Sequence, residues 1–358
     1  MRPSLVLLIL LSPALGRGAP ATLPSAGEPV EFPTFGVAVV PPAAGEWVEV
    51  PAGRPTKVVQ WTKVDVGTRK PRAFLSVDVE EAAGRTVRAF ADELAKRVNG
   101  MTSVTPPLSV GGEPTVRVHA PTAATATGPQ PTDAIVVEHA GWAYTLALFR
   151  VPSEAGQADL ETLARGVKWV PLEPPVKSLD LKTVRTLFRG RFDVTVPDAM
   201  RPIPADEAPT RVHLSLANLL ARRTEYFVMI QLLAKKQDTP FEQMEQALID
   251  GANRKTRKAE QWEWEPRRGG VAGGPVRVAT RAVEVEHMEG ITDAATGASG
   301  AARPWMQWGL VKLDEQRVIL LHFTINTDNS EDRAAYEQLG GRIVDSVRPG
   351  PGAVQLRQ

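Results

Sequence analysis

Alternating apolar residues mark the start of two similar stretches of the chain. The pattern Phe-x-Val-x-Val occupies residues 35–39 and recurs at residues 192–196. Side chains two positions apart share one face of a strand, so each stretch is expected to form a half-buried β-strand. Further β-rich stretches follow each copy, at residues 58–64 and 74–79 in the first half and at residues 212–216 and 227–233 in the second.

A helical spacing of apolar residues comes next in both halves. Residues three and four positions apart form one stripe along a helix, and burial of that stripe against a sheet stabilises the helix. In the second half Thr239, Pro240 and Glu242 form a capping-box arrangement that satisfies free amides of the first turn. The stripes consist of Val87, Phe90, Leu94 and Val98 in the first half, and of Phe241, Met244, Leu248 and Ala252 in the second.

A hairpin and a closing helix complete each half. Residues 135–149 and 309–323 both read as strand, tight polar turn and strand. Closing helical stripes then end shortly before Pro171 and Pro349, and they consist of Leu160, Leu163 and Val167, and of Tyr336, Leu339 and Ile343. Matched blocks in the same order predict an internal duplication.

The expected fold class is therefore α+β, with two tandem repeats, each an antiparallel β-sheet flanked by amphipathic helices. The first domain is expected at residues 31–170 and the second at residues 184–348. A proline-rich linker at residues 171–183 joins them, and residues 349–358 are expected to form a flexible tail. Low-complexity loops are expected before the late hairpins, at residues 120–132 and 290–303.

The amino terminus has the features of a cleavable secretory signal peptide. An apolar run at residues 5–11 follows a basic start, and small residues lead up to Gly16. Cleavage is expected between Gly16 and Arg17, with a flexible leader rich in proline and alanine up to residue 30. The apolar run is far shorter than the roughly 20 residues of a membrane-spanning helix. The sequence therefore predicts a periplasmic or extracellular protein with no integral membrane segment in its mature chain.

Composition narrows the classes of function. The 358-residue chain has 42 Lys and Arg against 41 Asp and Glu, a formal net charge of +1 that gives no reason to expect a nucleic-acid partner. The chain contains no cysteine, which excludes disulfides, thiolate metal sites and cysteine nucleophiles. It also has no phosphate-binding or dinucleotide-binding glycine motif, so no cofactor is expected.

Candidate chemistry is sparse along the chain. None of the five histidines lies in a catalytic or metal-binding motif. Glu284, Glu286, His287 and Glu289 are close in sequence, but on a strand the histidine would point away from the first two carboxylates, which favours a solvated acidic face. The basic cluster at residues 254–258 offsets the negative end of a helix dipole, and contact with an anion or an envelope polymer is the alternative.

The second half has two close pairs of tryptophans among the eight of the chain. Trp262 and Trp264 are two positions apart, and Trp305 and Trp308 lie just before the late hairpin. Buried cross-strand packing is one interpretation of these residues. The alternative is an exposed apolar platform that stacks against a sugar ring or a partner's side chain. Because the first half has no matching pair, these four residues are the candidate contact surface.

The order of these elements resembles the PsbP-like family, and the resemblance covers most of the chain twice. The opening motifs lie at residues 35–41 and 192–197, and the closing motifs at residues 160–171 and 339–349. The resemblance implies an antiparallel sheet flanked by helices in each half. It also implies a binding or accessory role, as in extrinsic photosystem subunits and exported bacterial lipoproteins. The lipid-carrying cysteine of the lipoprotein branch is missing here.

The sequence thus favours an exported, non-catalytic binding or accessory protein of the cell envelope, with an envelope protein or polysaccharide as its partner. An exported hydrolase whose catalytic residues meet only in space is the alternative, because such residues are not adjacent in sequence. A purely structural envelope component is a third class. The ligand and the oligomeric state stay open.

Overall fold

The computed structural model describes residues 28–42, 47–50, 56–65, 71–103, 109–125, 128–150, 157–188, 190–203, 211–221, 223–234, 239–257, 261–269, 274–285, 287–288, 304–314 and 317–351. The chain divides into two compact units, of which the first ends at Leu172 and the second begins at Glu173.

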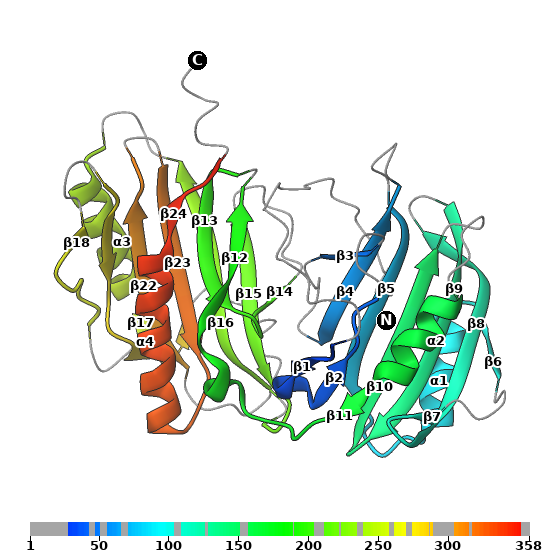
Figure 1. The fold of residues 1–358 in the computed structure, drawn as a ribbon. Helices are drawn as coiled ribbons and strands as arrows, with labels where there is room; N and C mark the ends of the chain where they lie inside the picture. The colour runs from blue at the N-terminus through cyan, green and yellow to red at the C-terminus, as the bar shows by residue number, and fades with distance from the viewer. Residues whose placement is uncertain are drawn as a thin grey trace, which may run out of the picture. The chain divides into compact units, whose positions relative to one another are not determined.

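The first unit is built on an eight-stranded antiparallel sheet (Figure 1). The order of its strands is β3-β4-β5-β10-β9-β8-β6, and β7 also pairs with β8. Their bounds are β3 (Trp47–Val50), β4 (Lys57–Val64), β5 (Pro71–Glu81), β6 (Met101–Ser103), β7 (Ser109–Val110), β8 (Glu113–Thr125), β9 (Gly128–His139) and β10 (Trp142–Arg150). A second sheet of three strands has the order β1-β2-β11, with β1 (Val30–Phe32), the 3-10 helix η1 (Pro33–Phe35), β2 (Val37–Val39) and β11 (Lys168–Trp169).

Two helices pack on the sheet of the first unit. Helix α1 (Val87–Arg97) begins after Thr86, whose hydroxyl accepts a hydrogen bond from the Ala89 amide at 3.2 Å. This cap satisfies one free amide of the first turn. The α1 residue Phe90 is buried against a cluster that includes Val116 and Val136 of the sheet. Helix α2 (Gln157–Gly166) lies on the other face of the sheet (Figure 1).

The second unit also has an eight-stranded antiparallel sheet. The order is β14-β15-β16-β23-β22-β19-β18, and β20 pairs with β22. Their bounds are β14 (Arg201–Ile203), β15 (Arg211–Asn218), β16 (Arg223–Ala234), β18 (Arg268–Gly269), β19 (Val276–Ala279), β20 (Val283–Glu284), β22 (Trp305–Lys312) and β23 (Arg317–Ile325). The smaller sheets are β12 (Leu181–Leu187), β13 (Phe192–Pro197) and β24 (Arg348–Pro349), and the pair β17 (Thr256–Arg257) and β21 (His287–Met288).

Helices α3 (Phe241–Lys255) and α4 (Ser330–Ser346) cover opposite faces of the second sheet. On β23, Val318 and Leu320 pack with α3, whereas Ile319 and Leu321 belong to the cluster that contains the α4 residue Tyr336. Successive side chains of a strand point to opposite faces, so one strand serves both cores.

The two large sheets have the same strand order when their strands are matched in sequence from β3 and β14 onwards. In both units a short strand that follows the last helix, β11 or β24, pairs with an early strand of its own unit, β2 or β13. A side chain found on a strand of one unit but not on the matching strand of the other is therefore not required by this strand order.

The expected α+β class with flanking helices is wrong, because the described part of the chain is mostly β. It contains four α-helices against two sheets of eight strands and several smaller ones. The error arose partly at residues 120–132, which were expected to be a loop. Residues 120–125 and 128–132 instead extend β8 and β9, because their backbones pair from Ala120 with Thr132 to Thr125 with Gly128. The expected loop at residues 290–303 lies outside the described residues.

The segment between the units, expected as a linker at residues 171–183, contains ordered elements of the second unit. Residues Pro175–Ser178 form the 3-10 helix η2, and Leu179 is buried in the second core. Strand β12 begins at Leu181 and pairs with β13. Apolar side chains therefore fix most of this segment to the second unit.

Candidate functional site

Trp262 lies in the interior of the second unit, with 2% of its surface exposed. Its indole Nε1 donates to the Met306 carbonyl at 3.0 Å. The Asn253 side chain accepts from the Trp262 amide at 3.0 Å and donates to the Trp262 carbonyl at 3.1 Å. A side chain held in this way offers no stacking surface, so Trp262 is not part of an exposed platform.

The other three tryptophans are half-buried and do not share one surface. Trp264 packs under α3, where its Nε1 donates to the Glu245 carbonyl at 3.1 Å. Trp308 contacts Trp262 edge to face, with ring centroids 6.0 Å apart, on the same side of the sheet. Trp305 packs against the α4 core, and the Arg333 guanidinium lies 4.0 Å from its ring centroid. Residues 305 and 308 are three apart on one strand, so their side chains point to opposite faces.

His322 is a buried histidine on the α3 face of the second sheet. Its ring stacks on Trp308, with centroids 4.3 Å apart, and its Nε2 has no hydrogen-bond partner among the described residues. Burial, and to a smaller extent the nearby His213, lower the pKa of His322 to about 4. The imidazole is therefore neutral in the folded protein near neutral pH.

The histidines of the first unit also take part in local contacts. The His139 ring stacks on Trp169, with centroids 4.2 Å apart, and its Nδ1 lies 3.3 Å from the Glu113 carboxylate. His119 Nδ1 lies 2.6 Å from the Asp133 carboxylate. These contacts are those of structural histidines.

Several other sequence candidates fall partly outside the described residues. These include Gly16 and Arg17 at the expected cleavage point, Glu286, Glu289, Lys258, and the side chains of His287, Lys255 and Arg257. Within the described residues, no group of three or more His, Asp or Glu could hold a metal ion. No helix within those same ranges has both the length and the apolar character to cross a bilayer.

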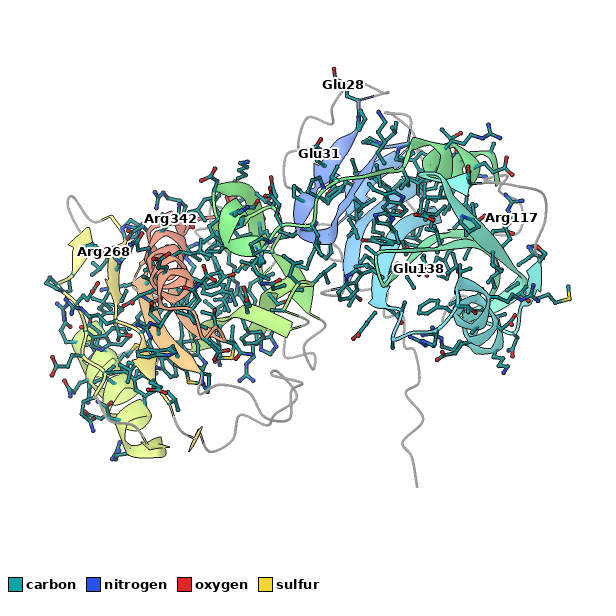
Figure 2. All side chains as sticks on the ribbon, turned by 90° about the horizontal axis from the view of Figure 1, so that it is seen from below. Glu28, Glu31, Arg117, Glu138, Arg268 and Arg342 are labelled. Carbon is teal, nitrogen blue, oxygen red and sulfur yellow. The ribbon has the colours of Figure 1, made fainter. Side chains whose placement is uncertain are left out.

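Three arginines that the sequence analysis did not single out meet at one edge of the second unit. Arg268 of β18 and Arg277 of β19 are directly opposite each other in an antiparallel pair. Arg348 lies just after the carboxyl end of α4. It follows Val347, whose carbonyl accepts a hydrogen bond from Arg277. Figure 2 labels Arg268 near α4, which also carries Arg342. We refer to Arg268, Arg277 and Arg348 as the arginine cluster.

Each arginine of the cluster has a contact at the end of α4. Arg268 Nη1 donates to the Asp345 carboxylate at 2.9 Å, and Arg277 Nη2 donates to the Val347 carbonyl at 2.8 Å. Arg348 Nη1 donates to the same carbonyl at 3.1 Å and to the Asp345 carbonyl. Carbonyls at the carboxyl end of a helix lack intrahelical partners and favour nearby cations, which explains these contacts.

The cluster nevertheless has excess positive charge. Desolvation lowers the pKa of Arg277. The charges of Arg348 and Arg268 also lower the pKa of Arg277, whereas the charge of Asp345 raises it. Two arginines directly opposite each other on paired strands repel. Asp345 is the carboxylate that the Arg268 side chain contacts, so the group carries three positive charges and one negative charge.

The first unit is different on the strands that match β18, β19 and β24. There Arg117 of β8 pairs with the Glu161 carboxylate of α2 at 2.6 Å, which balances one charge with another. This Arg117, labelled in Figure 2, lies on β8 between β9 and β6. After α2, strand β11 carries Trp169, which stacks on His139. Among the described residues of these matched strands, only those of the second unit carry a group of arginines.

No family model matches the chain, and no curated protein matches it. Among solved structures, that of cyanobacterial PsbP from Synechocystis sp. PCC 6803 is similar, with 15% sequence identity over 43% of this chain and 98% of that chain and a TM-score of 0.30. DynU16, a protein of the dynemicin biosynthetic locus, is 10% identical over 84% of this chain and 98% of that chain, with a TM-score of 0.10. The resemblance to PsbP is weak, and it does not bear on the tandem arrangement.

Proposed function

We propose that this chain is an exported, non-catalytic binding or accessory protein of the cell envelope that acts through its second unit. The observation that supports this proposal is the arginine cluster. It carries an excess of positive charge, and among the described residues of the first unit, which has the same strand order, β6, β8 and β11 carry no such group of arginines. Surface features that a shared fold does not require are candidates for recognition.

The sequence supports export as part of the same proposal. The apolar run at residues 5–11 and the small residues up to Gly16 are typical of a cleaved signal peptide. Outside the cytoplasm, the partner is an envelope protein or polysaccharide that carries negative charge. Attraction between such a partner and the arginines would be weakened by salt, because mobile ions screen exposed charges.

Cell fractionation and co-sedimentation test the proposal. Expressed in a bacterium, the chain should be recovered outside the cytoplasm with Arg17, or a residue within a few positions of it, as its amino terminus. The purified mature chain should then sediment with purified cell wall at about 0.05 M NaCl and be released at about 0.5 M NaCl, because the Debye length shortens several-fold over that range. Cytoplasmic protein with an intact Met1, or a chain that stays in the supernatant at low salt, contradicts the proposal.

A further inference from the structure

Unused hydrogen-bond donors distinguish the arginine cluster from ordinary helix capping. Arg268 Nε and Nη2 and Arg277 Nε are buried and have no acceptor among the described residues. Capping of α4 uses Arg277 Nη2, Arg348 Nη1 and, through Asp345, Arg268 Nη1. A buried N–H group without an acceptor costs free energy, which an added acceptor removes.

The position of the two strand arginines suits a ligand that accepts several hydrogen bonds. Side chains directly opposite each other in an antiparallel pair start about 5 Å apart and point to the same face. Arg268 and Arg277 stand in this relation, so their guanidinium groups leave the sheet side by side. Each guanidinium is a planar fork of N–H donors that matches the oxygens of phosphate or carboxylate groups.

Charge selects among such ligands. The cluster has three guanidinium groups and the single carboxylate of Asp345, an excess of two positive charges. That carboxylate already takes one N–H of Arg268 and leaves the other two donors unused. A dianion with tetrahedrally arranged oxygens supplies both the missing charge and the missing acceptors.

We infer that the arginine cluster is a binding site for a phosphate group, either free or carried by an envelope component. This inference assigns phosphate as the class of ligand for the proposed binding function, and it rests on that proposed function. Arg268 has 41% of its side-chain surface exposed and Arg348 is exposed, so the cluster reaches the surface at the edge of the unit, above the three buried unused donors. Asp345 acts as the competing intramolecular anion, and a bound phosphate replaces or joins it at Arg268.

Titration of the full mature chain with inorganic phosphate tests the site. At about pH 8, where phosphate is mostly the dianion, calorimetry should give saturable binding of one phosphate per chain at constant ionic strength. Arg268→Gln removes a charged donor and should weaken phosphate binding by about tenfold. Asp345→Asn removes the competing carboxylate and should strengthen it by about threefold or more, because the local charge becomes more positive.

Arg281→Gln is the matched control, because it makes the same charge change at a side chain that is 85% exposed and lies near Glu265. It should leave phosphate affinity unchanged. The opposite signs for Arg268→Gln and Asp345→Asn keep the test independent of a general loss of folding. Absence of saturable binding, or equal weakening by Arg281→Gln, overturns the inference.

Two comparisons distinguish the source of the phosphate group and separate the phosphate site from the proposed binding function. Inorganic phosphate that binds and also releases the chain from cell wall indicates that the wall component carries the same group. Phosphate that binds without releasing the chain indicates a free phosphate as ligand. If phosphate does not bind but the chain still sediments with the wall, the phosphate site is wrong and the proposed function stands.

Discussion

A single buried imidazole links the stability of the second unit to pH. His322 stacks on Trp308, and burial lowers its pKa to about 4, against an ordinary value near 6.5. In the unfolded chain this histidine takes up a proton near pH 6.5, whereas the folded protein takes it up only near pH 4. Acid therefore favours unfolding. His213 also lowers the pKa of His322, so it acts in the same direction as burial.

We predict that the free energy of unfolding falls by about 3 kcal/mol between pH 7 and pH 4 on account of His322 alone. Urea unfolding at several pH values measures the change. Because other groups titrate over this range, the relevant quantity is the difference between the natural protein and His322→Phe, which keeps an aromatic ring against Trp308. Parallel pH profiles for the two proteins would show that His322 does not carry the effect.

We predict that Trp262→Ala destabilises the second unit by about 3–5 kcal/mol, because it leaves a large cavity under α3 and an unpaired Met306 carbonyl. Chemical denaturation followed by circular dichroism measures the loss. Trp305→Ala is the comparison, since that ring is only half-buried and packs on the other face. A smaller loss for Trp262→Ala than for Trp305→Ala contradicts the buried position.

The sequence alone could predict part of the arrangement of the tryptophans and little of how the arginine cluster comes together. The spacing of three between Trp305 and Trp308 already implies opposite faces of a strand. It could not bring Arg348 together with Arg268 and Arg277, because the contact depends on where α4 ends over the sheet. The one local signal was the glycine-rich stretch at residues 269–274, which lies between two arginine-bearing strands.

At the scale of elements, α4 lies unusually close to the sheet. A Cβ atom on Gly309 of β22 would collide with Val344 Cγ2 of α4 and would contact Phe323 at 3.5 Å. Val344 is buried and β-branched, so its side chain has little freedom to move within a helix. The absence of a side chain at position 309 therefore sets the distance between the helix and the strand.

We predict that Gly309→Ala destabilises the second unit by about 1–3 kcal/mol through overpacking. Gly341→Ala provides the control, because a Cβ there meets nothing within 4 Å. Alanine favours the helix by about 1 kcal/mol relative to glycine, so this control should be neutral or stabilising. Thermal melting of both variants decides the matter, and equal melting temperatures would rule out the close contact.

Most helices lie where the apolar periodicity predicts them. A stripe of apolar residues spaced three and four apart is stable only when it is buried against a sheet. Helix α1 contains the Val87, Phe90 and Leu94 stripe, and α4 contains Tyr336, Leu339 and Ile343. Strands were underestimated instead. The stretch at residues 120–132 is rich in Ala, Thr, Gly and Pro, yet β8 and β9 pair along residues 120–125 and 128–132. Backbone hydrogen bonds leave little trace in the sequence.

At the scale of the whole molecule, each unit has its own core and its own closing strand. We predict that residues 28–172 and 173–351 each fold when expressed alone, with a cooperative thermal transition. A shorter second fragment, residues 184–348, should melt at a lower temperature because it lacks Leu179 and the first residues of β12. If fragment 173–351 shows no cooperative transition, the two units depend on each other.

The closing strands have a consequence for the order in which the parts of each unit can form. β24 pairs with β13, and the Gly350 amide donates to the Arg191 carbonyl at 3.2 Å, so the last strand of the second unit pairs with one of its first strands. β11 pairs with β2 in the first unit in the same way. Because these partners are separated by nearly the whole unit in sequence, each small sheet can be completed only after the rest of its unit has been synthesised, and such non-local pairing slows folding.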